Sequence, residues 1–312
     1  MNTKISQKKI GIIGGSGFVG SQLGGELIKN NRVCVLDLKE CDYKAEYVKC
    51  DITNREDVIS STKDLDILFH LGVNPNWHQN IIYPEVDYNI SVLGTLNVLE
   101  ACVKNNIKRL VFTSSVLVYG LGVKSPISEN ELCSPTTPYG AAKLMAEKYV
   151  NLYSVNYSIS TVILRYFRVY GGNEIFYPSP RGVVASFIHK IANGDEITIH
   201  GDGNQALDFV HVEDVIKATI SAASRENVNG IINIGSGSAT SVNYLAETIA
   251  DIFGNKIKKK YLDKNVQKNL QFTYEIPDVV GDISRAKEVL EYTPKIKLRE
   301  GIQRTIEYFN SI

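Results

Sequence analysis

The chain has no surplus of either charge, and this absence excludes two classes of partner. Its 34 Lys and Arg residues balance 34 Asp and Glu residues, so the formal net charge is zero near neutral pH. A protein that holds nucleic acid or an anionic membrane by electrostatic attraction needs a clustered basic surplus. The sequence therefore predicts neither a nucleic-acid partner nor a membrane partner.

Cysteine is also scarce. The five cysteines are odd in number and include no C-x-x-C pair, which argues against a disulfide framework and a zinc knuckle. The spacing of His70, His78 and His211 likewise predicts no metal site. A cytoplasmic location is expected, because the polar N-terminus lacks a signal-peptide core and no apolar run reaches the roughly 20 residues that cross a bilayer.

What the sequence does have is a regular alternation of short β-branched runs and longer stretches of helical spacing. The predicted strands are Lys9–Ile13, Arg32–Leu36, Glu46–Lys49, Asp66–Leu71, Arg109–Thr113 and Ser160–Tyr166. The predicted helices between them are Phe18–Lys29, Val86–Lys104 and Tyr139–Val155. This alternation predicts an α/β fold with a doubly wound (Rossmann) parallel sheet, covered by helices on both faces.

The second half of the chain predicts a smaller α/β domain. The pattern loosens after Gly171 into a loop-rich crossing, so we expect one domain over residues 1–170 and a second over residues 171–312. A β-like run at Ile231–Ile234 predicts that part of this half, near residues 212–235, returns to the first domain.

A glycine-rich turn follows the first predicted strand. Glycines at Gly14, Gly17 and Gly20 allow a sharp turn and a close approach to a pyrophosphate, and the N–H groups at the start of the helix face the anion. Asp37 ends the next strand, where a carboxylate accepts hydrogen bonds from an adenosine ribose and repels a 2′-phosphate. The pattern predicts a dinucleotide site that prefers NAD to NADP. The alternative is a structural turn without a ligand.

Three polar side chains form a second pattern. Tyr139 and Lys143 are four residues apart at the start of a predicted helix, so they share one face. Ser115 follows a strand and lies at the carboxyl edge of the sheet, where doubly wound folds bind ligands. An ammonium about 4 Å from a phenol lowers the phenol pKa from about 10 toward neutrality. We therefore predict Tyr139 as a base activated by Lys143, with Ser115 sharing the substrate hydroxyl. The alternative is an ordinary half-buried tyrosine beside a solvated lysine.

Other motifs follow in order along nearly the whole chain. They include Cys50-Asp51-Ile52, Phe69–Gly72, Asn89 with Gly94–Asn97, Thr113–Ser115, Arg165–Gly171, Gly201–Gly203, Asp208–Asp214 and Asn233–Gly235. Together with the glycine turn and the Tyr139/Lys143 pair, they resemble the extended short-chain dehydrogenase/reductase family. The resemblance is to its NAD-dependent sugar-nucleotide epimerase/dehydratase branch, the UDP-glucose 4-epimerase-like proteins.

The resemblance implies NAD as a bound cofactor and gives roles to individual residues. Tyr139 is expected to remove a sugar hydroxyl proton, Lys143 to lower the pKa of Tyr139 and hold the nicotinamide ribose, and Ser115 to bridge to the reacting oxygen. The residues expected to bind the cofactor are Gly14, Gly17, Phe18, Val19, Gly20, Asp37, Asp51, Ile52, Leu71, Gly72, Asn89, Thr113, Tyr139, Lys143 and Tyr166.

One departure from the family pattern bears on the reaction. Val116 and Leu117 follow Ser115 where the dehydrating members usually have an Asp-Glu pair. Without an acid at this place, 4,6-dehydration is disfavoured.

A second departure bears on the substrate. Arg168 stands where the family commonly has Asn, and Leu207 stands where it has Arg, both near the substrate diphosphate. We expect Arg168, together with Arg181, to anchor the diphosphate in place of the missing arginine. The alternative is a substrate that is not a standard sugar nucleotide.

The expected function is therefore the epimerisation of a nucleotide sugar at C4, through a transient 4-keto sugar, with the second domain binding the substrate. The alternatives are a nucleotide-sugar 4-dehydrogenase or reductase with net cofactor turnover, and a non-catalytic NAD-binding regulatory protein. A homodimer is expected, because members of the family often dimerise through the helices that correspond to Val86–Lys104 and Tyr139–Val155.

Overall fold

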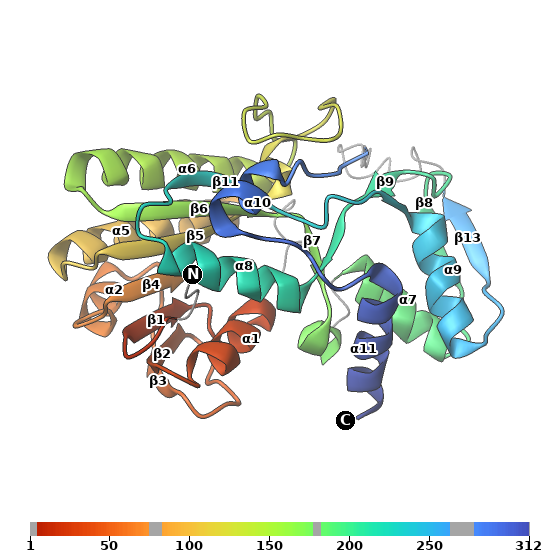
Figure 1. Ribbon diagram of the computed structural model, residues 1–312, viewed down its shortest axis with the longest axis horizontal. Coiled ribbons are helices and arrows are strands. Elements are labelled where there is room, and N and C mark those ends of the chain that lie inside the picture. The colour runs from red at the N-terminus through yellow and green to blue at the C-terminus, as the bar shows by residue number, and fades with distance from the viewer. Residues whose placement is uncertain (1–4, 75–82, 177–181, 263–277, 312) are drawn as a thin grey trace.

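The computed structural model describes residues 5–74, 83–176, 182–262 and 278–311. Its centre is a seven-stranded parallel sheet in the order β11-β6-β5-β4-β1-β2-β3 (Figure 1). The strands are β1 (Lys9–Ile13), β2 (Arg32–Asp37), β3 (Glu46–Lys49), β4 (Ile67–His70), β5 (Arg109–Ser115), β6 (Ser160–Tyr166) and β11 (Gly230–Ile234). The predicted α/β fold with a doubly wound parallel sheet is confirmed.

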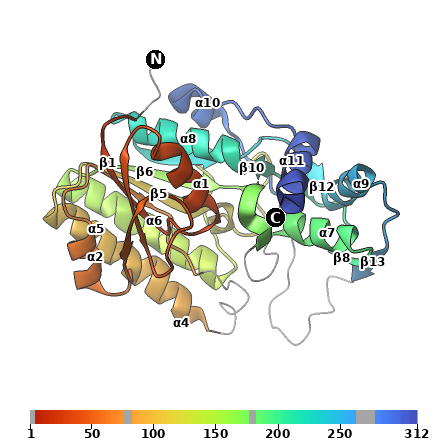
Figure 2. The ribbon, with the colours of Figure 1, turned by 90° about the horizontal axis from the view of Figure 1, so that it is seen from below.

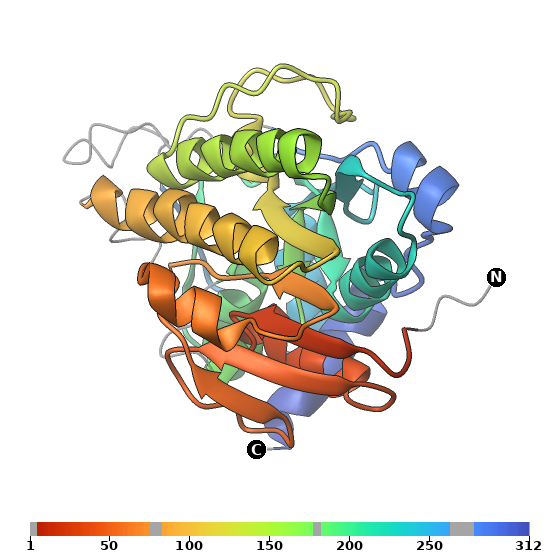
Figure 3. The ribbon, with the colours of Figure 1, turned by 90° about the vertical axis from the view of Figure 1, so that its left-hand side faces the viewer.

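Helices cover both faces of this sheet, as Figure 3 shows. Apolar side chains of α1 (Phe18–Leu27), α8 (Val212–Ser224) and α10 (Ser284–Leu290) pack on one face. Those of α2 (Arg55–Ser61), α5 (Gly94–Lys104) and α6 (Pro138–Tyr157) pack on the other. The central strands are buried on both faces, which explains why their sequences are nearly continuous apolar runs.

The segment before α5 changes its winding. A single helix was predicted over Val86–Lys104, whereas the structure has α4 (Pro84–Asp87), the π-helical η1 (Tyr88–Leu93) and then α5. Asp87 and Ser91 are both buried, and Asn89 between them is exposed. Wide π-helical turns inside helices are frequent at functional sites.

A second unit lies beyond the carboxyl edge of the sheet, on the right in Figures 1 and 2. Its strands form three short pairs, β7 with β10, β9 with β12 and β8 with β13. The strands are β7 (Arg168–Tyr170), β8 (Ile197–His200), β9 (Ala206–Leu207), β10 (Phe209–His211), β12 (Thr240–Ser241) and β13 (Lys259–Leu262). The helices are η3 (Gly172–Phe176), α7 (Val183–Ala192), α9 (Val242–Phe253) and α11 (Leu298–Asn310).

The chain passes between the two units repeatedly. β11 pairs in parallel with β6, with Ile231 opposite Ile163, and α8 and α10 pack on the sheet although they follow β7 in sequence. Residues 171–312 are therefore not a separate piece, because they supply one edge strand and two covering helices of the first unit.

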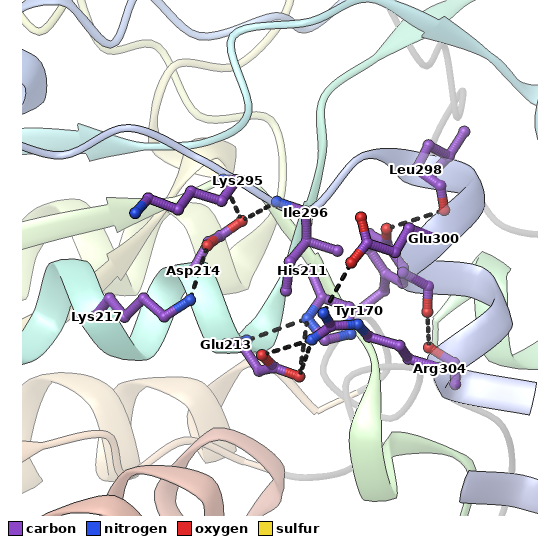
Figure 4. A network of polar contacts seen from close by, with 12 residues as sticks. Tyr170, His211, Glu213, Asp214, Lys217, Lys295, Ile296, Leu298, Glu300 and Arg304 are labelled. Atoms are coloured by element: carbon purple, nitrogen blue, oxygen red, sulfur yellow. Dashed lines mark hydrogen bonds and ion pairs between the residues drawn. The ribbon is translucent and has the colours of Figure 1, made fainter. Parts of the chain in front are cut away.

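Polar contacts join α8 to the C-terminal helix at this junction (Figure 4). The Asp214 carboxylate accepts hydrogen bonds from the backbone N–H groups of Lys295 and Ile296, each at 2.9 Å. Arg304 of α11 donates to both carboxylate oxygens of Glu213, at 2.9 and 2.8 Å. The start of α8 is thus fixed to the segment that leads into α11.

Candidate functional site

The glycine turn has the geometry of an anion-binding loop. Gly14 has φ of +76°, and a Cβ on Gly20 would lie 2.1 Å from the Gly14 carbonyl oxygen, so only glycine fits both positions. The Gly17 N–H donates to the Gly14 carbonyl at 3.1 Å and closes the turn. Phe18 and Val19 begin α1, so their N–H groups have no acceptor within the helix and remain available to an anion.

Asp37 ends β2 directly beside this turn. Its carboxylate accepts hydrogen bonds from the N–H groups of Ser16, at 3.1 Å, and Lys39, at 3.2 Å. The predicted adjacency of the acidic side chain and the glycine turn is thus present in the structure, which places a partly exposed carboxylate next to the available N–H groups.

The ends of the neighbouring strands complete this edge. After β3, Asp51 accepts hydrogen bonds from the N–H group of Thr53 at 2.9 Å and from its hydroxyl at 2.7 Å. Ile52 lies against Gly72, because a Cβ on that glycine would be 3.2 Å from the Ile52 Cδ1 atom. Leu71 donates its N–H to the Ile13 carbonyl at 2.9 Å.

A buried histidine supports the loop after β4. The Gly72 N–H donates to Nδ1 of His70 at 3.3 Å, and Nε2 lies 3.0 Å from the Thr95 hydroxyl, which itself donates to the Ser91 carbonyl at 2.6 Å. Burial, with a smaller effect of Lys143, lowers the pKa of His70 to about 3, so the ring is neutral. These contacts indicate a positioning role for His70.

Tyr139 and Lys143 lie on the first turns of α6. The helix begins at Pro138 after Thr137, whose hydroxyl caps it. Lys143 is 1% exposed, and its ammonium donates to the Thr113 carbonyl at 2.9 Å and lies 6.0 Å from the centre of the Tyr139 ring. The structure thus brings together the end of β5 and the two residues predicted to act as a pair.

The electrostatics of the pair differ from the prediction. Burial, and then the charge of Asp87, raise the pKa of Tyr139 above its ordinary value. Burial lowers the pKa of Lys143 to about 7, against the opposing effects of Glu147 and Asp87. Lys143 therefore does not lower the pKa of Tyr139 in this structure, because the same burial that brings the two groups together disfavours the charged form of each.

Ser115 ends β5 beside this pair. It is partly exposed, and its hydroxyl oxygen accepts a hydrogen bond from the Leu117 N–H at 3.2 Å. Val116, 8% exposed, and Leu117 follow it in η2 (Val116–Val118), so the position after Ser115 is apolar.

The side chains of two predicted cofactor-binding residues, Asn89 and Tyr166, lie away from Tyr139 and Lys143. Asn89 is exposed, and on η1 it lies on the opposite side from Asp87 and Ser91, because two residues are about half a helical turn. The Tyr166 hydroxyl lies 2.6 Å from the hydroxyl of Thr219 on α8, on the face of the sheet away from α6. The side chains of Asn89 and Tyr166 therefore do not join Tyr139 and Lys143, and Tyr166 has only its backbone at the strand end to offer a ligand.

Arg168 lies where the two units meet. Its N–H donates to the Asp208 carbonyl at 3.1 Å, while its Nε is buried without a hydrogen-bond partner among the described residues. Burial lowers the pKa of this guanidinium. Leu207 beside it is 1% exposed and packs in the apolar core of the second unit. Arg181 lies outside the described residues.

None of the helices in the described ranges is long and apolar enough to span a membrane. The same ranges contain no group of three or more His, Cys, Asp or Glu side chains placed to hold a metal ion.

Comparison with known proteins identifies the family. Residues 10–235 match the model of the NAD dependent epimerase/dehydratase family. The chain belongs to this family. It is therefore an enzyme of a family that uses NAD, as the sequence predicted.

Relatives match over almost the whole chain. A Methanocaldococcus jannaschii protein provisionally named as a UDP-glucose 4-epimerase is 36% identical over 96% of this chain and 98% of its own. The UDP-N-acetyl-alpha-D-glucosaminuronate decarboxylase of Bacillus cytotoxicus is 30% identical over 98% of this chain and 99% of its own. The crystal structure of UDP-glucose 4-epimerase from Thermotoga maritima, with UDP-glucose, has a TM-score of 0.89 at 30% identity and covers 97% of this chain and 99% of its own.

The residues present at the sheet edge fit NAD. The tight contact between Gly14 and Gly20 leaves the backbone open to a pyrophosphate, and Asp37 presents acceptor oxygens beside that turn. The buried ammonium of Lys143 lies at the carboxyl end of β5, further along the same edge.

Proposed function

We propose that this protein is an NAD-dependent epimerase of a nucleotide sugar that inverts the configuration at C4 through a transient 4-keto sugar. The observation that carries the proposal is the buried Lys143 beside Tyr139, held by the Thr113 carbonyl at the same sheet edge as the glycine turn. The names of the relatives support a nucleotide sugar as the substrate class, although they include a decarboxylase as well as 4-epimerases.

Each side chain has a defined task in this proposal. NAD, which the glycine turn, Asp37 and Lys143 would hold, would supply the reversible hydride chemistry that inversion through a 4-keto sugar requires. With NAD bound, the positive charges of Lys143 and of the oxidised nicotinamide would favour the phenolate form of Tyr139, and this phenolate would accept the proton of the sugar hydroxyl and later return it. Ser115 would donate a hydrogen bond to the same oxygen. The Lys143 ammonium fixes a positive charge beside the phenol. The apolar Val116 leaves no acid there for dehydration.

The test is the loss of the Tyr139 hydroxyl. Tyr139→Phe should lower turnover by about 10²-fold to 10⁴-fold while NAD still binds. Tyr157→Phe, an exposed tyrosine at the end of the same helix, should leave turnover unchanged. The substrate is found first by screening UDP-, GDP-, CDP- and dTDP-sugars for thermal stabilisation. Unaltered turnover in Tyr139→Phe would refute the assignment, and net accumulation of NADH would identify a dehydrogenase or reductase instead.

We further propose that Arg168 anchors the substrate diphosphate. Arg168 is partly buried where the two units meet, and its Nε has no hydrogen-bond partner among the described residues. An arginine can bind two phosphate oxygens at once in a bidentate manner. Arg168→Ala should raise KM about 10-fold to 100-fold, which corresponds to a lost charged hydrogen bond of about 1.5–3 kcal/mol. Arg299→Ala, an exposed arginine of α11, should not change KM. An unchanged KM in Arg168→Ala would remove the anchor from the proposal.

A homodimer through α5 and α6 is proposed as the assembly. Both helices pack on the sheet and also carry exposed large apolar side chains, a residue type that marks protein–protein interaction sites where it forms a contiguous surface. These residues are Val103, Met145, Leu152, Val155 and Tyr157. Light scattering after size-exclusion chromatography should give twice the chain mass, and Leu152→Glu should give a monomer.

A further inference from the structure

Tyr43 is a partly buried tyrosine that none of the sequence motifs indicated. It lies in the segment between β2 and β3, and its hydroxyl donates a hydrogen bond to the Gly15 carbonyl of the glycine turn at 3.2 Å. The hydroxyl keeps its proton, because burial raises the pKa of Tyr43 above its ordinary value. The ring lies against α1, since a Cβ on Gly24 would be 2.1 Å from the hydroxyl oxygen and 2.5 Å from the ring carbon that carries it. One side chain therefore joins the loop after β2 to both the glycine turn and α1.

The peptide group between Gly15 and Ser16 is held from both of its ends. Its carbonyl oxygen accepts the hydrogen bond from Tyr43, and its N–H, on Ser16, donates to the Asp37 carboxylate at 3.1 Å. The same peptide is enclosed by α1, because a Cβ on Gly20 would lie 2.8 Å from the Gly15 Cα atom. Tyr43 and Asp37 together therefore fix which way this peptide points.

This peptide adjoins both features expected to bind the adenosine diphosphate part of NAD. Phe18 and Val19, whose N–H groups are available to the pyrophosphate, lie at the start of α1 directly beyond the turn. Asp37 accepts one hydrogen bond on each oxygen, from Ser16 at 3.1 Å and from Lys39 at 3.2 Å. A carboxylate has about four lone-pair sites, so ribose hydroxyls can still bind. A site that is ordered in advance binds its ligand more tightly, because less conformational freedom is lost on binding.

We propose that Tyr43 is a positioning residue of the cofactor site, whose hydroxyl holds the Gly15–Ser16 peptide, and through it the Asp37 carboxylate, in the orientation that binds the adenosine half of NAD. Gly24 belongs to the same arrangement, because only a residue without a side chain leaves room there for the Tyr43 hydroxyl. The role rests on NAD as the cofactor of the family and on the expected place of Asp37 at the ribose. It requires no sugar substrate and goes beyond the epimerase reaction proposed above.

The first test removes the Tyr43 hydroxyl alone. In calorimetric titrations of nucleotide-free protein, Tyr43→Phe should raise the dissociation constant for NAD about threefold to tenfold, the range expected for one neutral hydrogen bond. ADP-ribose, which has no nicotinamide, should weaken by the same factor, because the contact serves the adenosine half.

Tyr292→Phe is the matched control for this test. Its buried hydroxyl also donates to a glycine carbonyl, that of Gly235 at 2.8 Å, but Gly235 follows β11, at the opposite end of the sheet from β2 and β3. Tyr292→Phe should lower the melting temperature and leave both dissociation constants unchanged. A hydrogen bond of Tyr43 that served stability alone would behave in the same way.

The second test moves Tyr43 without changing it. Gly24→Ala places a Cβ against the hydroxyl oxygen, so the phenol must leave the Gly15 carbonyl, and the dissociation constant for NAD should rise as in Tyr43→Phe. At the neighbouring position, the new Cβ of Gly25→Ala meets nothing within 4 Å, and the dissociation constant should not change. Gly24→Ala and Tyr43→Phe act on one contact, so the double variant should raise the constant by less than the product of the two single effects.

These titrations decide the role of Tyr43 without a sugar substrate. A higher dissociation constant for NAD in both single variants, with a double variant that falls short of their product, supports the positioning role. A constant that Tyr43→Phe or Gly24→Ala leaves unchanged, or two effects that multiply, overturns it. The result is independent of the identity of the substrate and of the Tyr139→Phe outcome.

Discussion

The ion pair between Arg165 and Glu147 should be one of the most costly contacts to break in this protein. Glu147 lies one turn after Lys143 on α6, and the two side chains of the pair are 3% and 1% exposed. Glu147→Gln keeps the size and shape of the side chain but leaves the Arg165 guanidinium buried without a carboxylate. Removing one partner of a buried pair typically costs about 3–5 kcal/mol, because the remaining charge is not solvated.

Urea denaturation followed by circular dichroism measures this cost. With a dependence on urea of about 3 kcal/mol per molar, a loss of 3–5 kcal/mol lowers the unfolding midpoint by about 1–1.7 M. Arg304 and Glu300 form the matched control, because their contact of 2.7 Å equals the Arg165–Glu147 contact while their side chains are 43% and 49% exposed. Glu300→Gln should cost no more than about 1 kcal/mol.

A double variant separates charge from packing. Glu147→Met/Arg165→Met replaces both charges with apolar side chains of similar length, so most of the lost stability should return. If Glu147→Gln and Glu300→Gln shift the midpoint equally, or if the double variant is no more stable than Glu147→Gln, burial does not determine the strength of this pair.

Three further predictions concern the cofactor edge. Gly20→Ala places a Cβ 2.1 Å from the Gly14 carbonyl oxygen and should weaken NAD binding, measured by calorimetry, at least tenfold. In the control Gly25→Ala, in the same helix, the new Cβ meets nothing within 4 Å. This control should leave the affinity for NAD unchanged and add about 0.5–1 kcal/mol to the free energy of unfolding. Asp37→Ser should reduce the preference for NAD over NADP in the same assay, since the carboxylate that repels a 2′-phosphate is gone; an unchanged ratio would contradict its placement at the ribose. The pKa of His70 is about 3 in the folded protein, below its unfolded value near 6.5. The free energy of unfolding should therefore be unaffected by His70 above about pH 6.5 and should fall by about 1.4 kcal/mol per pH unit below it. Thermal melts of His70→Asn should lack this slope.

The sequence predicted those features that depend on short stretches of chain. The six strands expected in the first half lie within two residues of their observed bounds. Strands at the centre of the sheet, such as β1 and β4, are nearly continuous apolar runs because both of their faces are buried. Tyr139 and Lys143 share a helix face and Asp37 adjoins the glycine turn, since both relations follow from local geometry. The helix α2 was not predicted, because its seven residues bury only Val58 and Ile59 and so give little periodic signal.

The features that the sequence did not predict depend on packing between distant segments. Asn89 is exposed on η1, which is wound as a π-helix, and the pattern of residues alone does not show this winding. Asp87 is one of two acids on α4, and only the packing of the folded chain shows that it is buried while Glu85 is exposed. The pKa of Tyr139 is raised rather than lowered because residues from other parts of the chain exclude water from it, which a distance estimate from sequence spacing omits.

The interleaving of the two units restricts how this protein can be cut or recombined. A fragment of residues 1–170 would lack β11, α8 and α10, so β6 would become an open sheet edge and one face of the sheet would lose its cover. Exchange of the second half with that of a related gene at a single crossover would replace those three elements together with the substrate unit. A working chimera would therefore require several joined segments. β11, α8 and α10 would have to come from the same parent protein as residues 1–170, although they lie in the second half of the sequence.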